Sequence, residues 1–110
     1  MDINQNSING HTVLTLGGQI DSTAAMKFEE TIVELIASGT NNMIIDFSKV
    51  QFISSAGLRV LLVAAKKVKP YGGKVILCNL STDVLEVFNI SGFSVLFSIY
   101  DNMDEAVKNS

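Results

Sequence analysis

Two adjacent serines, Ser54 and Ser55, are the residues whose type and position suggest chemistry. They follow an apolar run typical of a strand, residues 43–47, and precede a long apolar-periodic stretch typical of a helix. The first turn of a helix carries unpaired N–H groups and the positive end of the helix dipole, which together favour an anionic group by about 0.3–1 kcal/mol. A serine at this place can cap the helix or carry a phosphate.

Gly57 lies two residues after the serines, within the first turn of the expected helix. Glycine inside a helix costs about 0.5–1 kcal/mol relative to alanine, so it indicates close backbone approach by the neighbouring sheet or by a docking partner. Ser54 fits the ordinary N-cap position, with Ser55, Ala56 and Gly57 as the first helical residues. The residues alone leave open whether the two hydroxyls are only structural.

Asp21 and Asp46 are the acidic residues expected near strand ends close to the serines. Two carboxylates in such a place could chelate magnesium or perform acid–base chemistry, and Asp21 could equally cap the helix that follows it. A serine hydrolase would need glycines two residues on either side of its nucleophile, and Ile53 and Gly57 do not supply that pattern. We therefore predict a protein that is not an enzyme, with no catalytic residue, metal site or cofactor.

Alternating strand and helix patterns organise the whole chain. Asn9-Gly10, between two short strand-like runs, is a strong hairpin signal, and helices joined to strands by short loops favour a mainly parallel sheet with right-handed crossovers. We expect strands at 3–8, 12–16, 43–47, 74–78 and 95–100, and helices at 22–38, 55–68, 81–88 and 102–108. The prediction is one α/β domain, residues 1–110, with a mixed, mainly parallel sheet opened by an N-terminal β-hairpin and with about four helices.

Composition excludes several classes of function. A net charge of −3 with scattered lysines gives no basic stripe for nucleic acid, and no apolar run is long enough for a membrane span. The first residues lack the features of a signal peptide, so we expect a cytoplasmic protein that does not act at a membrane. Cys78, in an apolar run, is expected to be buried and inert, and one cysteine with one histidine cannot build a zinc site.

Two motifs carry a resemblance to a known family. Residues 44–58, IIDFSKVQFISSAGL, resemble the signature of the STAS domain, in particular of the small bacterial anti-sigma factor antagonists, and residues 16–21, LGGQID, resemble that family's segment before the first helix. The family's phosphorylated serine, which precedes a small residue, glycine and leucine, corresponds to Ser55. Many members carry an acidic residue and a second Ser or Thr where this chain has Ser54 and Ala56.

The resemblance implies a phosphorylation-controlled partner switch in bacterial transcription regulation and signal transduction. The unphosphorylated protein would bind an anti-sigma factor serine/threonine kinase and free the sigma factor, phosphorylation at Ser55 would end this binding, and a metal-dependent serine/threonine phosphatase would reset the switch. The expected partner-binding residues are Asp21, Ser22, Ser54, Ser55, Ala56, Gly57 and Arg59. Two alternatives are a constitutive STAS scaffold or regulatory subunit of transport or secretion machinery, and a sensor holding a small ligand near the carboxyl ends of the strands.

Overall fold

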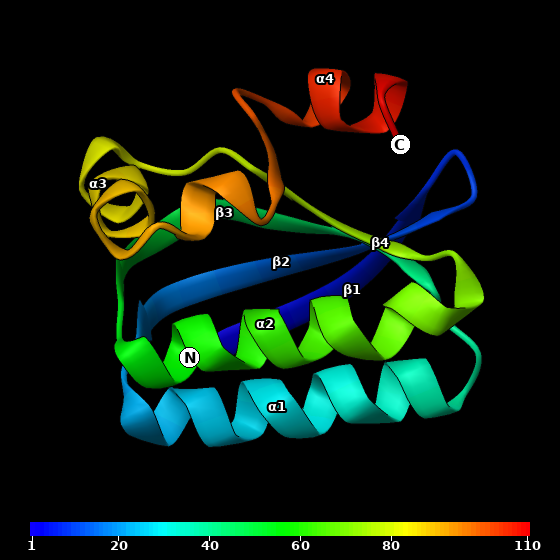
Figure 1. Ribbon diagram of the computed structural model, residues 1–110, viewed down its shortest axis with the longest axis horizontal. Helices are drawn as coiled ribbons and strands as arrows, with labels where there is room; N and C mark the ends of the chain where they lie inside the picture. Colours follow the sequence, from blue (N-terminus) through cyan, green and yellow to red (C-terminus); the bar gives the residue numbers. More distant parts are fainter.

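A five-stranded sheet with strand order β1-β2-β3-β4-β5 forms the centre of the computed structural model, which describes residues 1–110 (Figure 1). β1 pairs with β2 antiparallel, and the other neighbouring strands are parallel. In chain order the elements are β1 (Asp2–Ile8), β2 (His11–Ile20), α1 (Ser22–Ala37), β3 (Asn42–Ile53), α2 (Ser55–Val68), η1 (Lys69–Tyr71), β4 (Lys74–Cys78), α3 (Thr82–Ser91), η2 (Phe93–Val95), β5 (Ser98–Tyr100) and α4 (Met103–Lys108).

The N-terminal hairpin has the predicted turn. Ile8 pairs with His11, so Asn9 and Gly10 are the two loop residues, and both have positive φ, 51° and 82°. Positive φ at both central positions is the requirement of a type I′ turn, whose twist matches that of the two strands. The predicted mixed sheet, opened by a hairpin and accompanied by four α-helices, is confirmed.

The two faces of the sheet are covered unequally. α1, α2 and α3 supply buried residues to a large core on one face, where α1 and α2 lie side by side (Figure 1). The short helix α4 covers a smaller apolar cluster on the other face, made of Val13, Ile44, Ile76, Cys78 and Ala106. Residues of β3 alternate between the clusters, with Met43, Ile45 and Phe47 facing the large core and Ile44 facing α4.

Three predicted strands have different lengths in the structure, and β2 is one of them, since it continues beyond Leu16 to Ile20. β3 does not end at Phe47 but continues to Ile53, because its second half pairs with the equally extended β2 as far as Ile20. β5 begins only at Ser98, and the predicted strand residues before it include the short helix η2. That turn brings Phe93 within 6.4 Å of Phe97, between ring centroids, while Phe97 is buried against Phe88. Aromatic packing therefore replaces strand pairing in this segment.

Candidate phosphorylation and docking site

The ends of β2 and β3 lie together and place two helix N-termini at one end of the molecule. The Ser54 N–H donates a hydrogen bond of 2.8 Å to the carbonyl oxygen of Ile20, which joins the two strand ends directly. α1 begins one residue after Asp21 and α2 one residue after Ser54, and the two helices then run side by side (Figure 1). The carboxyl ends of β2 and β3 thus bring together residues from two separate motifs, 16–21 and 44–58.

Ser54 and Ser55 have different roles in this geometry. Ser54 is the N-cap of α2, and its half-buried Oγ accepts a hydrogen bond of 3.2 Å from the N–H of Gly57. Ser55 is the first residue of α2, is exposed, and its hydroxyl makes no hydrogen bond within the protein. The Ser54 hydroxyl is therefore engaged in holding the helix, whereas the Ser55 hydroxyl is accessible to another molecule.

Asp21 caps the neighbouring helix in the same way. Its Oδ1 accepts a hydrogen bond of 2.9 Å from the N–H of Ala24, and both Asp21 and Ser22 are exposed. The capping role that the sequence left open for Asp21 is confirmed. Its second carboxylate oxygen makes no hydrogen bond within the protein, so the exposed carboxylate also contributes a negative charge to this surface.

Gly57 is buried because α2 begins very close to the strand ends. A Cβ atom at this position would lie 2.8 Å from Cγ2 of Ile20 and 2.8 Å from Cγ1 of Ile53. Of the two explanations for this glycine, close approach by the sheet is the one that the structure supports. Ala56 is half-buried, so within the first turn of α2 Ser55 is the most exposed position.

Two features of this surface were missed by the sequence analysis. Arg59, predicted to face a partner, is bound to Glu29 of α1 through Nη2 and Oε1 at 2.9 Å, with 60% of the arginine side chain exposed. Phe52 is 46% exposed on β3, two residues before the N-cap of α2. No pattern in the sequence marked it, because residues 48–53 were not predicted as a strand and their burial does not alternate, with Gln51 and Phe52 both exposed.

Asp46 lies away from the serines, contrary to the expectation for this residue. It is in the middle of β3, where Oδ1 accepts hydrogen bonds from the side-chain amide of Asn79 (3.0 Å) and the N–H of Ser48 (2.9 Å). The nearby Cys78 is fully buried, and burial, with a smaller effect of the Asp46 charge, raises the pKa of its thiol to about 12. The thiol is protonated at neutral pH, so Cys78 is inert as predicted.

Comparison with known proteins identifies the family. The STAS domain family matches residues 2–106. The chain belongs to this family. BtrV of Bordetella bronchiseptica, provisionally named an anti-sigma factor antagonist, is 33% identical over 106 residues, covering 96% of this chain and 91% of BtrV. The anti-sigma-B factor antagonist of Bacillus subtilis is 30% identical over 99 residues, covering 90% of this chain and 88% of that protein.

A solved structure agrees with the assignment of the fold. SpoIIAA of Bacillus, in its phosphorylated form, matches this STAS domain with a TM-score of 0.76 and 23% sequence identity, covering 98% of this chain and 97% of SpoIIAA. Its unphosphorylated form, described as an anti-sigma factor antagonist, gives the same TM-score. The likeness extends over nearly the whole domain. In this chain, no helix combines the length and the apolar character needed to cross a membrane.

Proposed function

We propose that this protein is an anti-sigma factor antagonist that is switched off by phosphorylation at Ser55. In its unphosphorylated form it binds an anti-sigma factor serine kinase and thereby frees a sigma factor. A metal-dependent serine/threonine phosphatase returns the phosphorylated protein to this form. The names of BtrV and of the Bacillus subtilis relative support the antagonist role, and the existence of SpoIIAA in two phosphorylation states supports the switch.

The assignment of the phosphorylation site to Ser55 rests on the different hydrogen bonding and exposure of the two serine hydroxyls. Phosphorylating Ser54 would remove the hydroxyl that caps α2 from its hydrogen bond with Gly57 and would place the charge in a half-buried position. Ser55 can accept a phosphate without breaking any hydrogen bond of its own side chain. A phosphate there also meets the positive end of the α2 dipole, so the free phosphoprotein remains stable.

The off state follows from charge and desolvation. A phosphate adds about −1.5 to −2 charges to the surface around Ser55, which already carries the exposed carboxylate of Asp21. Burying this charge against a partner without a matching cation is costly. Loss of binding therefore requires no movement inside the domain.

The docking surface combines the predicted residues with one addition. Asp21, Ser22 and Ser55 are exposed at the two helix N-termini, and Phe52 is an exposed aromatic side chain just before them. Aromatic residues frequently supply much of the binding energy at an interface. Ser54 and Gly57 contribute to this surface by fixing the start of α2, because one caps the helix and the other lets it approach the sheet.

The direct test is a binding titration against the anti-sigma factor serine kinases of the source organism. Calorimetry should detect binding of the unphosphorylated protein to one of them, and the stoichiometrically phosphorylated protein should bind much more weakly. Equal binding of the two forms would reject the switch. An absence of phosphate on the protein in cells, with binding intact, would favour the constitutive scaffold.

Arg59 provides a test of the docking surface. Arg59→Glu is expected to weaken kinase binding, because it reverses a charge one turn from Ser55. It also breaks the ion pair with Glu29 and places two carboxylates together, so the free energy of unfolding should fall by about 0.2–1 kcal/mol. Calorimetric titration and thermal denaturation measure the two effects.

A charge swap tests whether Arg59 contacts the kinase directly or whether its ion pair with Glu29 only positions α1 and α2. Arg59→Glu combined with Glu29→Arg should restore stability by rebuilding the pair in reverse. If Arg59 touches the kinase, the double variant still binds weakly. Recovery of wild-type affinity would instead mean that the pair acts only by holding α1 and α2 together.

Asp21 provides a second test, aimed at kinase recognition. Asp21→Asn should leave stability nearly unchanged, because asparagine caps a helix as well as aspartate and can keep the bond to Ala24. The negative charge is lost, so we expect slower phosphorylation by the cognate kinase, measured as the initial rate of phosphate incorporation. A rate equal to that of the wild-type protein would leave Asp21 with its capping role alone.

A further inference from the structure

A cavity lies at the opposite end of α2 from Ser55, where β5 is too short to cover β4. β5 first pairs with β4 at Ile76, so Lys74 and Val75 extend beyond it, and the chain reaches β5 through η2. The cavity has a volume of about 390 Å³, within the range of about 300–1,000 Å³ usual for small-molecule sites. Its apolar lining residues are Leu62, Ala65, Val68, Val75, Leu96 and Phe97.

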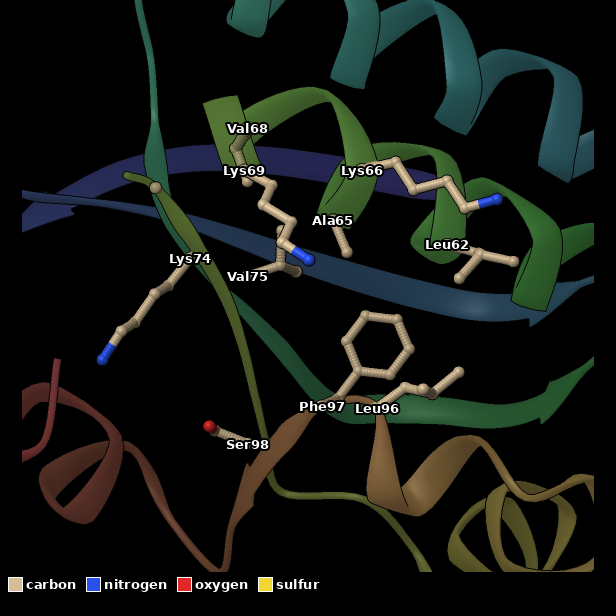
Figure 2. A pocket seen from close by; sticks show the side chains of 11 residues that line it. Leu62, Ala65, Lys66, Val68, Lys69, Lys74, Val75, Leu96, Phe97 and Ser98 are labelled. Atoms are coloured by element: carbon tan, nitrogen blue, oxygen red, sulfur yellow. The ribbon is translucent and has the colours of Figure 1, made fainter. Parts of the chain in front are cut away.

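The charges around this cavity are all of one sign. Lys66, Lys69 and Lys74 line it and no acidic residue does, although the chain as a whole has a net charge of −3. None of the three lysines forms an ion pair, since the chain has one ion pair, Arg59–Glu29. In Figure 2 the Lys69 side chain extends from the end of α2 toward Val75, whereas the Lys66 and Lys74 side chains extend away from Val75.

The apolar side of the cavity is accessible from outside. Leu96 is 55% exposed, although it is a large hydrophobic residue, and its side chain lies beside the Phe97 ring below α2 (Figure 2). An apolar lining with the unpaired ammonium group of Lys69 beside it complements a molecule that has a hydrocarbon part and one anionic end. This site is separate from the Ser55 surface, because Lys69 lies about 20 Å along α2 from Ser55 at 1.5 Å per residue.

We propose that this cavity binds a free medium-chain monocarboxylate. The hydrocarbon chain lies on the surface formed by Leu62, Val75 and Leu96, and the carboxylate accepts hydrogen bonds from the ammonium group of Lys69. Each methylene that is buried should strengthen binding by about fourfold. The site differs from the ligand position expected from the sequence, since it lies at the amino end of β4 and not at the carboxyl ends of the strands.

The test is a titration of the ¹⁵N-labelled full chain with sodium octanoate, followed by backbone amide shifts. We expect saturable shifts confined to residues 62–75 and 96–98, tighter binding of octanoate than of hexanoate, and weaker binding of octanol. Lys69→Gln should weaken octanoate binding by about fivefold. Lys67→Gln is the matched control, because Lys67 is exposed in the last turn of α2, two residues before Lys69, but does not line the cavity, and it should change the affinity by less than about twofold.

The proposal would be overturned by shifts that do not saturate, by octylammonium binding as tightly as octanoate, or by equal effects of Lys67→Gln and Lys69→Gln. Shifts centred on the exposed Ile90 and Val95 would also reject it, because they would report nonspecific contact with apolar surface. Binding should weaken when the ionic strength is raised from about 0.01 M to about 1 M, since salt screens an exposed ion pair.

Discussion

Incubation with the cognate kinase and ATP is expected to add one phosphate to the wild-type protein, and Ser55→Ala is expected to abolish this phosphorylation. Ser54→Ala should still be phosphorylated. The physical reason is the difference in the two hydroxyls, because that of Ser54 is held by the N–H of Gly57 and that of Ser55 is exposed and unbonded. Intact-protein mass spectrometry counts the phosphates, and peptide mapping locates them.

The two serine variants should also differ in stability, and here Ser54→Ala, which is still phosphorylated, should be the more strongly affected. Removing the cap in Ser54→Ala should lower the free energy of unfolding by about 0.5–2 kcal/mol. Ser55→Ala removes an exposed hydroxyl without an intramolecular partner and should change it by no more than about 0.5 kcal/mol. Denaturant unfolding of both variants therefore provides an internal control for the phosphorylation assay.

Function should follow the phosphate at Ser55. Ser55→Ala should bind the kinase permanently, and Ser55→Asp should bind weakly, although a carboxylate carries less charge and fewer acceptor oxygens than a phosphate. Phosphate that maps to Ser54 would show that the assignment of the site is wrong while the switch exists. Phosphate on neither serine would reject the switch.

Substitution of Gly57 is expected to destabilise the domain even though it improves the helix. Alanine would gain about 0.5–1 kcal/mol in helix propensity, but its Cβ would lie 2.8 Å from both Ile20 and Ile53. Overpacking of a core costs about 1–3 kcal/mol, so we expect Gly57→Ala to be less stable than the wild type and Gly57→Val to be less stable again. Thermal and denaturant unfolding measure both variants.

A double-mutant cycle identifies the cause of this destabilisation. In an Ile53→Ala background one of the two crowding side chains is gone, so Gly57→Ala should cost less there than in the wild-type protein. Ala56→Gly, one residue earlier in the same turn, shows the effect of helix propensity away from the Ile20 and Ile53 contacts. A Gly57→Ala protein more stable than the wild type would contradict the close packing of α2 on the strand ends.

The sequence by itself determined the features that depend on neighbours along the chain. Asn9-Gly10 predicted the hairpin because positive φ is a local requirement of its turn. Asp21 and Ser54 predicted the helix starts because a capping bond reaches only three residues ahead. The two motifs indicated the STAS family and marked Ser55. The alternation of strand and helix patterns after the hairpin was enough to predict the mixed sheet.

Only the tertiary structure decided features that depend on strand length and register. β3 extends to Ile53 because β2 is there to pair with it, and this extension separates Asp46 from the serines. Pairing of Asp46 with Cys78 of β4 places its carboxylate beside Asn79. Partners 30 and 33 residues apart in sequence, such as Arg59 with Glu29 and Asn79 with Asp46, leave no periodic signal in either segment. The cavity beside Lys69 likewise exists because β5 is shorter than its pattern predicted, and a strand ends where packing of its aromatic residues outweighs pairing.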